Sequence, residues 1–204
     1  AAPEPATVAP APRAQMQAPP PPPAVQAQTP PPSIAVAAAP VRETTGDAPA
    51  ASPAKPLFDR SALEVHSSGR ISEIFGPEFA GQDGFARQVR MPEPPLLLAD
   101  RVMSIKGEPR SMGKATIVTE TDVGSQTFYL HENRMPGGIL IESGQADLMA
   151  ISWLGVDFLN RGERVYRLLG CDLTYHGNLP RKGETVRYEI SVDGHANQGD
   201  VRLF

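Results

Sequence analysis

A histidine and a glutamate in the middle of this sequence are of the types and spacing that acid–base chemistry requires. His131 is expected on a loop, and Glu142 about one and a half turns into the helix that follows it. An imidazole changes its protonation near neutral pH and therefore suits the role of a general base. A carboxyl group on a buried, apolar helix is expected to keep its proton and to donate it. The pair could therefore remove one proton and supply another in a single reaction.

Two glycines at the expected start of that helix could bind an anion. Gly137 and Gly138 follow Pro136, and the first amides of a helix have no partner within the helix. Because glycine has no side chain, these amides stay open to a ligand, and the helix dipole favours negative charge beside them. Elimination of water from a β-hydroxyacyl thioester needs a base, an acid and donors for an enolate-like oxygen. The histidine, the glutamate and this helix start could supply those three roles.

Each of these residues also has a plain structural interpretation. A lone loop histidine is more often a surface or turn residue, and a glutamate near a helix start commonly satisfies helix amides. The Pro-Gly-Gly sequence is also typical of a tight loop. No metal-ligand spacing, phosphate-binding glycine loop or Gly-x-Ser-x-Gly elbow occurs in the sequence. The other candidates are more typical of structure than of chemistry: a solvated face at Arg161, Glu163, Arg164 and Arg167, a small core thiol at Cys171, and solvated histidines at His176 and His195.

The hydrophobic pattern indicates the elements that must position these residues. Apolar residues on nearly every side of 137–162 predict one long buried helix. Two short helices are expected at 60–66 and 70–75, and Gly76-Pro77 should stop the second. Five strands are expected, at 96–107, 113–123, 163–176, 184–196 and 200–204. The resulting fold class is α+β, with an antiparallel sheet wrapped around one long helix.

The composition divides the chain into three parts. Residues 1–56 hold 16 of the 23 prolines and no aromatic residue. Such a segment buries too little apolar surface to offset the entropy of ordering, so we expect a disordered linker between domains. A helical and loop-rich lead-in is expected at 57–92, and the domain with the candidate site at 93–204. The first residue is Ala and the last expected strand is cut short, which predicts a piece of a longer polypeptide.

Several classes of function are disfavoured by composition. The formal net charge of −4 argues against a nucleic-acid-binding surface. No run of 18 or more apolar residues occurs, so no membrane span is expected. The single cysteine, Cys171, cannot form a disulfide within the chain, and the N-terminus lacks the basic and apolar regions of a signal peptide. We therefore expect a cytoplasmic protein.

The central stretch also resembles a known family. MPGGILIES, starting at Met135, resembles the Met-Pro-Gly loop and helix start of the β-hydroxyacyl-ACP dehydratases, which carry an acidic residue where Glu142 stands. LLLADRV at 96–102 resembles the first strand of that family. RISEIFGPEF, RMPGGILIESGQADLMAISWLGVD and RVYRLLGCDLTYHGNLPRKGETVRYEISVDGHANQGDVRLF resemble more closely the dehydratase region of polyketide-synthase-like polyunsaturated fatty acid synthases. The resemblance covers roughly 57–204.

This resemblance implies a hot-dog fold and the dehydration of 3-hydroxyacyl chains. The substrate would be carried on the phosphopantetheine arm of an acyl carrier protein, and neither a cofactor nor a metal ion would be needed. Further implied partners are other synthase domains in the same polypeptide and a second hot-dog domain or homodimer partner, because the two catalytic groups of the family often come from different halves. The implied site consists of His131 as base, Glu142 as acid, the Gly137 amide as oxyanion donor, and Gly138, Met135 and Pro136 around the substrate.

One departure from the family pattern leaves alternatives open. His131 lies four residues before Met135, whereas the catalytic histidine of the stand-alone enzymes lies seven residues before the equivalent methionine. The first alternative is a non-catalytic hot-dog half that completes a neighbouring dehydratase domain. The second is a hot-dog thioesterase in which Glu142 activates water. The residues also leave open whether the new double bond is isomerised.

Overall fold

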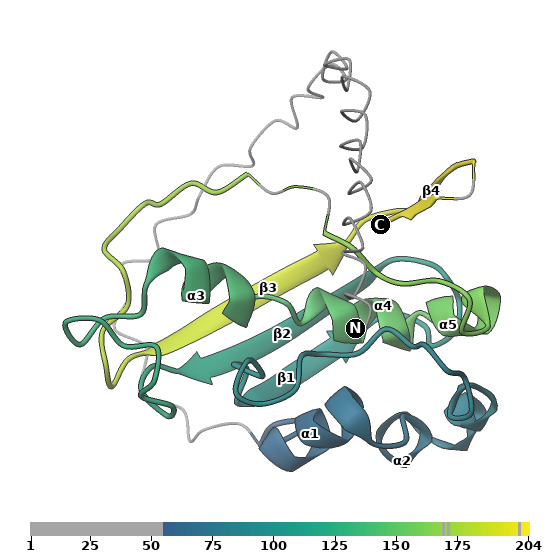
Figure 1. The fold of residues 1–204 in the computed structure, drawn as a ribbon, viewed down its shortest axis with the longest axis horizontal. Helices are drawn as coiled ribbons and strands as arrows, with labels where there is room; N and C mark the ends of the chain where they lie inside the picture. The colour runs from purple at the N-terminus through teal and green to yellow at the C-terminus, as the bar shows by residue number, and fades with distance from the viewer. Residues whose placement is uncertain (1–54, 169, 171, 200) are drawn as a thin grey trace, which may run out of the picture. The chain divides into compact units, whose positions relative to one another are not determined.

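The computed structural model describes residues 55–168, 170, 172–199 and 201–204 (Figure 1). These residues belong to one compact unit of the chain. The linker expected at 1–56 lies outside them except for its last two residues, and so does Cys171. None of the helices in the described part of the chain has the length and apolar character needed to cross a membrane.

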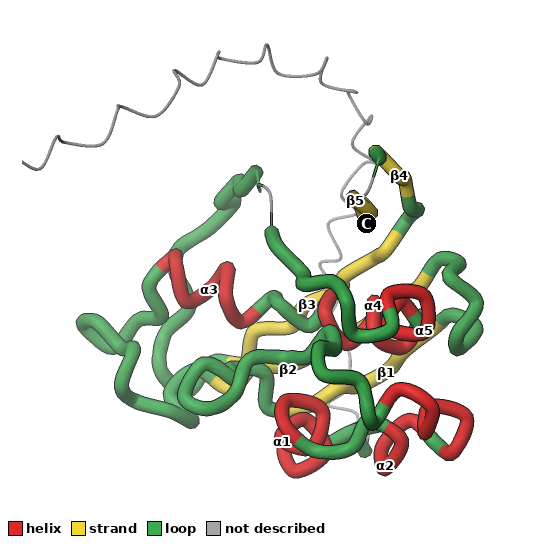
Figure 2. Tube along the Cα trace, turned by 45° about the vertical axis from the view of Figure 1, so that its right-hand side comes forward, coloured by secondary structure: helices red, strands yellow, loops and turns green. Residues whose placement is uncertain are grey.

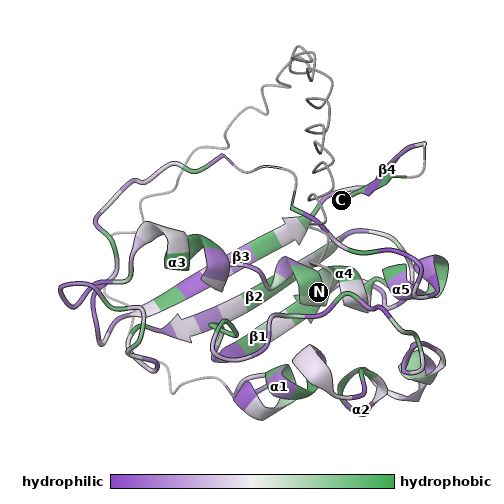
Figure 3. Ribbon diagram, in the orientation of Figure 1, coloured by the Kyte–Doolittle hydropathy of each residue, from purple (hydrophilic) through white to green (hydrophobic). Residues whose placement is uncertain are grey.

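A three-stranded antiparallel sheet forms the centre of this unit. Its strands, in the order β1-β2-β3, are β1 (Arg101–Lys106), β2 (Ala115–Asp122) and β3 (Thr185–Val192). On the inner face Ile117 pairs with Ile190, and on the outer face Glu120 pairs with Arg187. Bands of apolar and polar residues alternate along β3 in Figure 3. This alternation is why these segments form strands, since successive side chains of a strand point to opposite faces.

Three short helices replace the single long helix expected at 137–162. They are α3 (Gly137–Ser143), α4 (Asp147–Trp153) and α5 (Val156–Asn160), and α4 packs against β2 and β3 (Figure 2). The first break follows Gly144, the C-cap of α3. The second is at Gly155, whose φ of 86° lies in the left-handed region, and a Cβ there would lie 2.8 Å from Arg110 Cα. The prediction of burial is confirmed for α4, but the prediction of one continuous helix is wrong because these glycines interrupt it.

Two of the three N-terminal helices lie close to the predicted ranges, and the third forms after Gly76-Pro77, where no helix is predicted. They are α1 (Arg60–Ser68), α2 (Ser72–Phe75) and the 3-10 helix η1 (Pro77–Gln82). Asp59 caps α1 by accepting a hydrogen bond from the Ala62 amide at 3.1 Å. The ring of Phe79, which is fully buried, stacks on Trp153 of α4 with a centroid separation of 5.7 Å. The lead-in and the central helix therefore share one hydrophobic core.

The strand predictions are confirmed only in part. The first strand begins at Arg101 rather than at residue 96, although Leu97 and Leu98 are buried. The segment 184–196 ends as a strand at Val192, and a separate hairpin follows, made of β4 (Ala196–Gln198) and β5 (Val201–Leu203). The strand expected at 163–176 is wrong, because the described residues of this segment run as irregular chain. An alternating pattern needs a paired neighbour to become a strand, and among the described residues only β2 pairs with β3. The α+β class is confirmed in this coarse form.

Asp100, just before β1, and Arg101, its first residue, form hydrogen bonds across the sheet. The Arg101 guanidinium donates to Glu120 at 2.7 Å and to both oxygens of Asp122 at 2.7 and 2.9 Å. Asp100 accepts a hydrogen bond from the Asp122 amide at 2.7 Å. Arg187 of β3 donates to the second oxygen of Glu120 at 2.9 Å. The network spans all three strands, so this motif fixes strand register.

Two buried ionisable groups hold the segment that joins η1 to β1. His66 is fully buried, and its Nδ1 accepts from the Met91 amide at 3.1 Å. Burial, with a smaller contribution from the charge of Arg90, lowers the pKa of His66 to about 3. Asp157 on α5 accepts from the Val89 amide at 3.0 and 3.1 Å, and burial raises the pKa of Asp157 to about 6. Both groups are therefore neutral over part of the acidic range.

These two groups should give opposite pH dependences of stability. Below pH 6.5, the pKa of His66 in the unfolded chain, the unfolded chain binds a proton at His66 that the folded chain does not. The free energy of unfolding therefore decreases as the pH is lowered. Between about 6 and 3.8 the folded chain binds a proton at Asp157 that the unfolded chain releases, so this group offsets the loss. In Asp157→Asn, urea unfolding between pH 6 and pH 4 should show a decline steeper by up to about 1.4 kcal/mol per pH unit. The exposed control Asp193→Asn should leave the slope unchanged; an equal slope in all three proteins contradicts this account.

Candidate active site

The loop before α3 is held in place by backbone hydrogen bonds. His131 and Arg134 exchange amide hydrogen bonds of 3.0 and 2.9 Å, and the two residues between them, Glu132 and Asn133, have φ of 49° and 59°. Both central residues of this turn are thus left-handed, as in a type I′ turn. The Lys182 amide donates to Asn133 O at 2.8 Å, which ties the turn to the segment leading into β3. The position of His131 is therefore fixed by the backbone on both sides.

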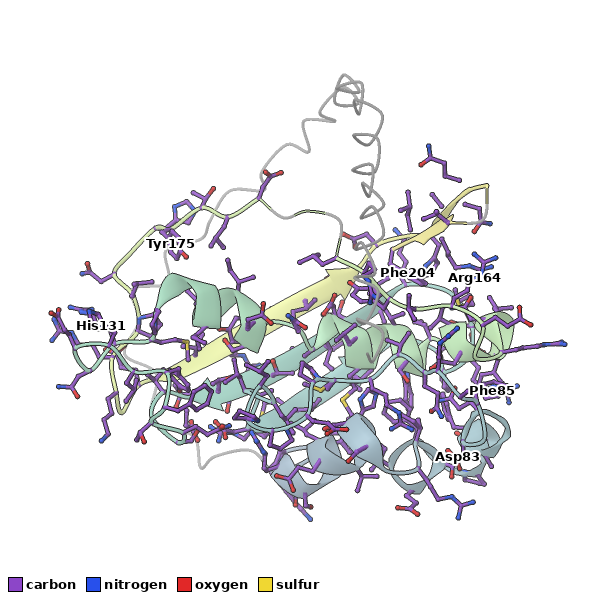
Figure 4. The ribbon with its side chains drawn as sticks, in the orientation of Figure 1. Asp83, Phe85, His131, Arg164, Tyr175 and Phe204 are labelled. Carbon is purple, nitrogen blue, oxygen red and sulfur yellow. The ribbon has the colours of Figure 1, made fainter. Side chains whose placement is uncertain are left out.

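His131 lies at the outer edge of this loop, with its side chain exposed (Figure 4). The structure shows no hydrogen bond of its imidazole to any described residue. Within the described part of one chain, the structure therefore shows no hydrogen bond between His131 and Glu142.

Met135 and Pro136 anchor the start of α3. The Met135 side chain is fully buried in a second hydrophobic cluster with Leu98, Val123 and Tyr129. Its amide donates to Pro180 O at 2.8 Å. Pro136 is the N-cap of α3 and has an extended backbone, which suits a helix entry. In this structure Met135 packs in the core, so its expected place beside a substrate stays a prediction.

The helix start at Gly137 and Gly138 is confirmed. α3 begins at Gly137, and no side chain caps its first amides. A Cβ on Gly138 would meet nothing within 4 Å, whereas a Cβ on Gly137 would lie 2.5 Å from Tyr175 Oη. The hydroxyl of Tyr175 thus lies directly against the helix start, above α3 in Figure 4. The sequence pattern placed Tyr175 in a strand and gave no sign of this contact, which brings together residues distant in the chain.

Glu142 lies in the last turn of α3, about 7 Å along the helix from Gly137 at 1.5 Å per residue. Its side chain is half-buried and accepts a hydrogen bond from Gln145 Nε2. The neighbouring Ser143 hydroxyl is buried and bonds to the Tyr188 hydroxyl of β3, which also donates to Leu140 O at 3.0 Å. Burial, the main cause, raises the pKa of Tyr188. α3 is thereby fixed to the sheet, with Glu142 held by Gln145.

A second carboxylate on the helical segment was not singled out from the sequence. Asp147 begins α4, and its Oδ2 accepts from the Tyr166 hydroxyl at 2.9 Å. Burial raises the pKa of Asp147, and the same cause raises the pKa of Tyr166. Only the hydrogen bond from Tyr166, which lies on a distant loop, distinguishes Asp147 from an ordinary acid in the first turn of a helix. The bond marks a partly buried pair between α4 and the irregular segment that follows α5.

The remaining histidines have structural settings. His176 is exposed in the irregular segment before β3, as the sequence predicts. His195 is half-buried, with Nε2 2.7 Å from Gly113 O and its ring against Phe204 at 4.9 Å between centroids. The expected solvated role of His195 is therefore wrong, because the β4–β5 hairpin folds back over it.

The sequence of this chain is similar to that of a fatty acid synthase subunit. It is 41% identical over 151 residues to a polyunsaturated fatty acid synthase subunit of Thraustochytrium sp. (strain ATCC 26185 / S-3). The match covers 72% of this chain but only 10% of that protein. No known protein family model matches the chain. The chain is therefore similar to one region of a much longer synthase polypeptide.

Proposed function

We propose, from the premise that this chain is the counterpart of a region in a polyunsaturated fatty acid synthase, that it dehydrates 3-hydroxyacyl chains to trans-2-enoyl chains. The acyl chain is carried as a thioester on the phosphopantetheine arm of an acyl carrier protein, and the reaction uses no other cofactor. The single observation that carries this proposal is the likeness to the synthase polypeptide over most of the chain. The amides at the start of α3, which no side chain caps, add a chemical reason.

The proposed reaction balances with the residues present. The His131 imidazole takes the proton from C2 of the substrate, and the electron pair left behind forms the C2–C3 double bond. The C3–O bond breaks, and Glu142 protonates the departing oxygen, which leaves as water. Negative charge that develops on the thioester oxygen is stabilised by the amide of Gly137. Exchange with solvent returns a proton to Glu142 and removes one from His131.

A second hot-dog half completes the proposed site. His131 is exposed at the loop edge and Glu142 is half-buried on α3, without a bond between them. Since a base and an acid must act on the same substrate, we infer that a partner half brings a histidine to the substrate beside Glu142. We propose a hot-dog fold for the complete unit, with a second copy of the chain or a similar domain as the partner half, beside the other domains of the synthase.

The non-catalytic half is the second candidate function. Exposure of His131 in the first position of a tight turn favours it, because a surface turn is also the usual place of a histidine without a catalytic role. In that case α3 and β3 would contribute only surface to a neighbouring dehydratase domain.

Product analysis distinguishes these functions. The protein is incubated with a 3-hydroxyacyl carrier thioester and, separately, with a saturated acyl carrier thioester, and the products are identified by mass spectrometry. We expect loss of one water from the first substrate and no change in the second. Release of free acid from the saturated substrate would establish a thioesterase instead. If no product forms with the isolated chain or with the complete synthase, the non-catalytic half is the remaining candidate function.

A further inference from the structure

Tyr188 of β3 contacts the last turn of α3, which carries Glu142 and lies over this strand in Figure 1. The Tyr188 hydroxyl donates to Leu140 O at 3.0 Å. Because that hydroxyl has only one proton, its hydrogen bond with the buried Ser143 hydroxyl is one in which Ser143 donates. A Cβ on Gly144 would lie 3.4 Å from two atoms of the Tyr188 ring, so the ring also packs on this turn. The sheet therefore holds the turn through both the hydroxyl and the ring of one tyrosine.

This contact compensates for the shortness of α3. The helix has seven residues, whereas an isolated helix shorter than about 12–15 residues is marginal in water. Its regular hydrogen bonding also stops early, because the Gly144 amide donates to Ile141 O at 3.0 Å rather than to Leu140 O. Leu140 O lies 3.0 Å from both hydroxyl oxygens, that of Ser143 and that of Tyr188. A side chain from the sheet thus takes the place of a backbone donor at the end of the helix.

Glu142 projects from another side of this turn. At about 100° per residue, Glu142 lies about 100° around the helix from Ser143 and about 160° from Gly144. Ser143 and Gly144 face Tyr188, so the Glu142 side chain is directed away from that tyrosine. There the carboxylate accepts a hydrogen bond from Gln145 Nε2. Tyr188 therefore bonds to the turn rather than to the carboxylate, but any rotation or shift of the turn would move the carboxylate with it.

We propose, on the basis of the dehydration proposed above, that Tyr188 is a positioning residue: its hydroxyl fixes the last turn of α3 and thereby aims the Glu142 carboxyl at the departing oxygen of the substrate. Proton donation needs the two oxygens to approach within about 2.6–3.2 Å. A misplacement of about 1 Å can lower a rate by about 10²-fold. The Tyr188 hydroxyl thus acts on the reaction through Glu142 alone.

Tyr188→Phe in the complete synthase tests this role. The variant keeps the ring against Gly144, and the Ser143 hydroxyl can then donate to Leu140 O, so no buried group of this turn loses its partner. The fold of the 204-residue chain should therefore persist, which circular dichroism checks. For dehydration of a 3-hydroxyacyl carrier thioester we expect kcat to fall about tenfold and KM to stay within about twofold of the parent value, because the acid acts in the transition state and not in substrate binding.

A double-mutant cycle distinguishes positioning from a purely structural role. In the Glu142→Gln background the carboxyl that Tyr188 aims is absent, so Tyr188→Phe should change the residual kcat by less than about twofold. A structural role would lower kcat by the same factor in both backgrounds. Tyr166→Phe is the matched control, since it removes a hydroxyl that anchors α4 through Asp147 and leaves α3 untouched. This control should keep the kcat of the parent.

Three results overturn the role of Tyr188 while leaving the proposed dehydration intact: an unchanged kcat in Tyr188→Phe, the same factor of loss in both backgrounds, or an equal loss in Tyr166→Phe. If Glu142→Gln alone leaves the rate of the synthase unchanged, dehydration through Glu142 fails first, and the role of Tyr188 fails with it. A loss of kcat that Tyr188→Phe causes only where Glu142 is present supports both.

Discussion

Glu142→Gln is expected to lower the rate of dehydration of a 3-hydroxyacyl carrier thioester by about 10²–10⁴-fold. The amide has the size of the carboxyl group and can still bond to Gln145, but it cannot donate a proton to the departing hydroxyl. Because the amide can keep the hydrogen bond to Gln145, unfolding in urea should be nearly unchanged. The measurement is the initial rate of enoyl product formation under saturating substrate.

The matched control for this substitution is Glu132→Gln. Glu132 is an exposed acid on the turn next to His131, and Glu132→Gln makes the same replacement of a carboxyl group by an amide outside the proposed reaction. Its rate should stay close to that of the parent. Equal rates for the Glu142→Gln variant and the parent would contradict the assignment of the acid.

Gly137→Pro should lower the rate by about 10²–10³-fold relative to Gly137→Ala. Proline removes the amide hydrogen that we assign to the thioester oxygen. The helix should tolerate proline here, because Gly137 is the first residue of α3 and the preceding Pro136 already has an extended backbone. Both substitutions add a Cβ that displaces Tyr175, so their ratio isolates the loss of the amide donor.

Gly138→Ala provides the control for helix geometry. A Cβ at Gly138 meets no atom within 4 Å, so this variant should keep its amide, its fold and its rate. If Gly137→Pro and Gly137→Ala have the same rate, the Gly137 amide does not bind the oxyanion, and the effect of either variant comes from Tyr175 alone.

The elements that local signals define could be predicted from the sequence. Asp59 and Gly76-Pro77 mark the ends of the N-terminal helices, and the alternation in 115–122 gives β2. The prediction of one long helix was wrong because its apolar pattern continues across Gly155, whose φ of 86° lies in the left-handed region and breaks the helix. The prediction of a strand at 163–176 was wrong because an alternating pattern does not reveal whether a neighbouring strand is present.

The sequence could predict the parts of the candidate site that depend on neighbouring residues, but not the contacts between distant segments. The helix start at Gly137 follows from Pro-Gly-Gly, and the structure confirms it. The contact of Tyr175 with Gly137 and the bond of Tyr166 to Asp147 join residues from different segments, so no local pattern carries them. The prediction of a solvated charged face is confirmed, because the structure leaves the side chains of Arg161, Glu163, Arg164 and Arg167 exposed.

The fatty-acid profile made by the complete synthase tests the central claim most directly. His131→Gln and Glu142→Gln are introduced separately, with Glu132→Gln as the control, and the number of double bonds per chain is measured by mass spectrometry. The account predicts that each of the first two variants lowers unsaturation or halts the chain at the 3-hydroxyacyl stage, whereas the control retains the parent profile. An unchanged profile in both the His131 and Glu142 variants would contradict it.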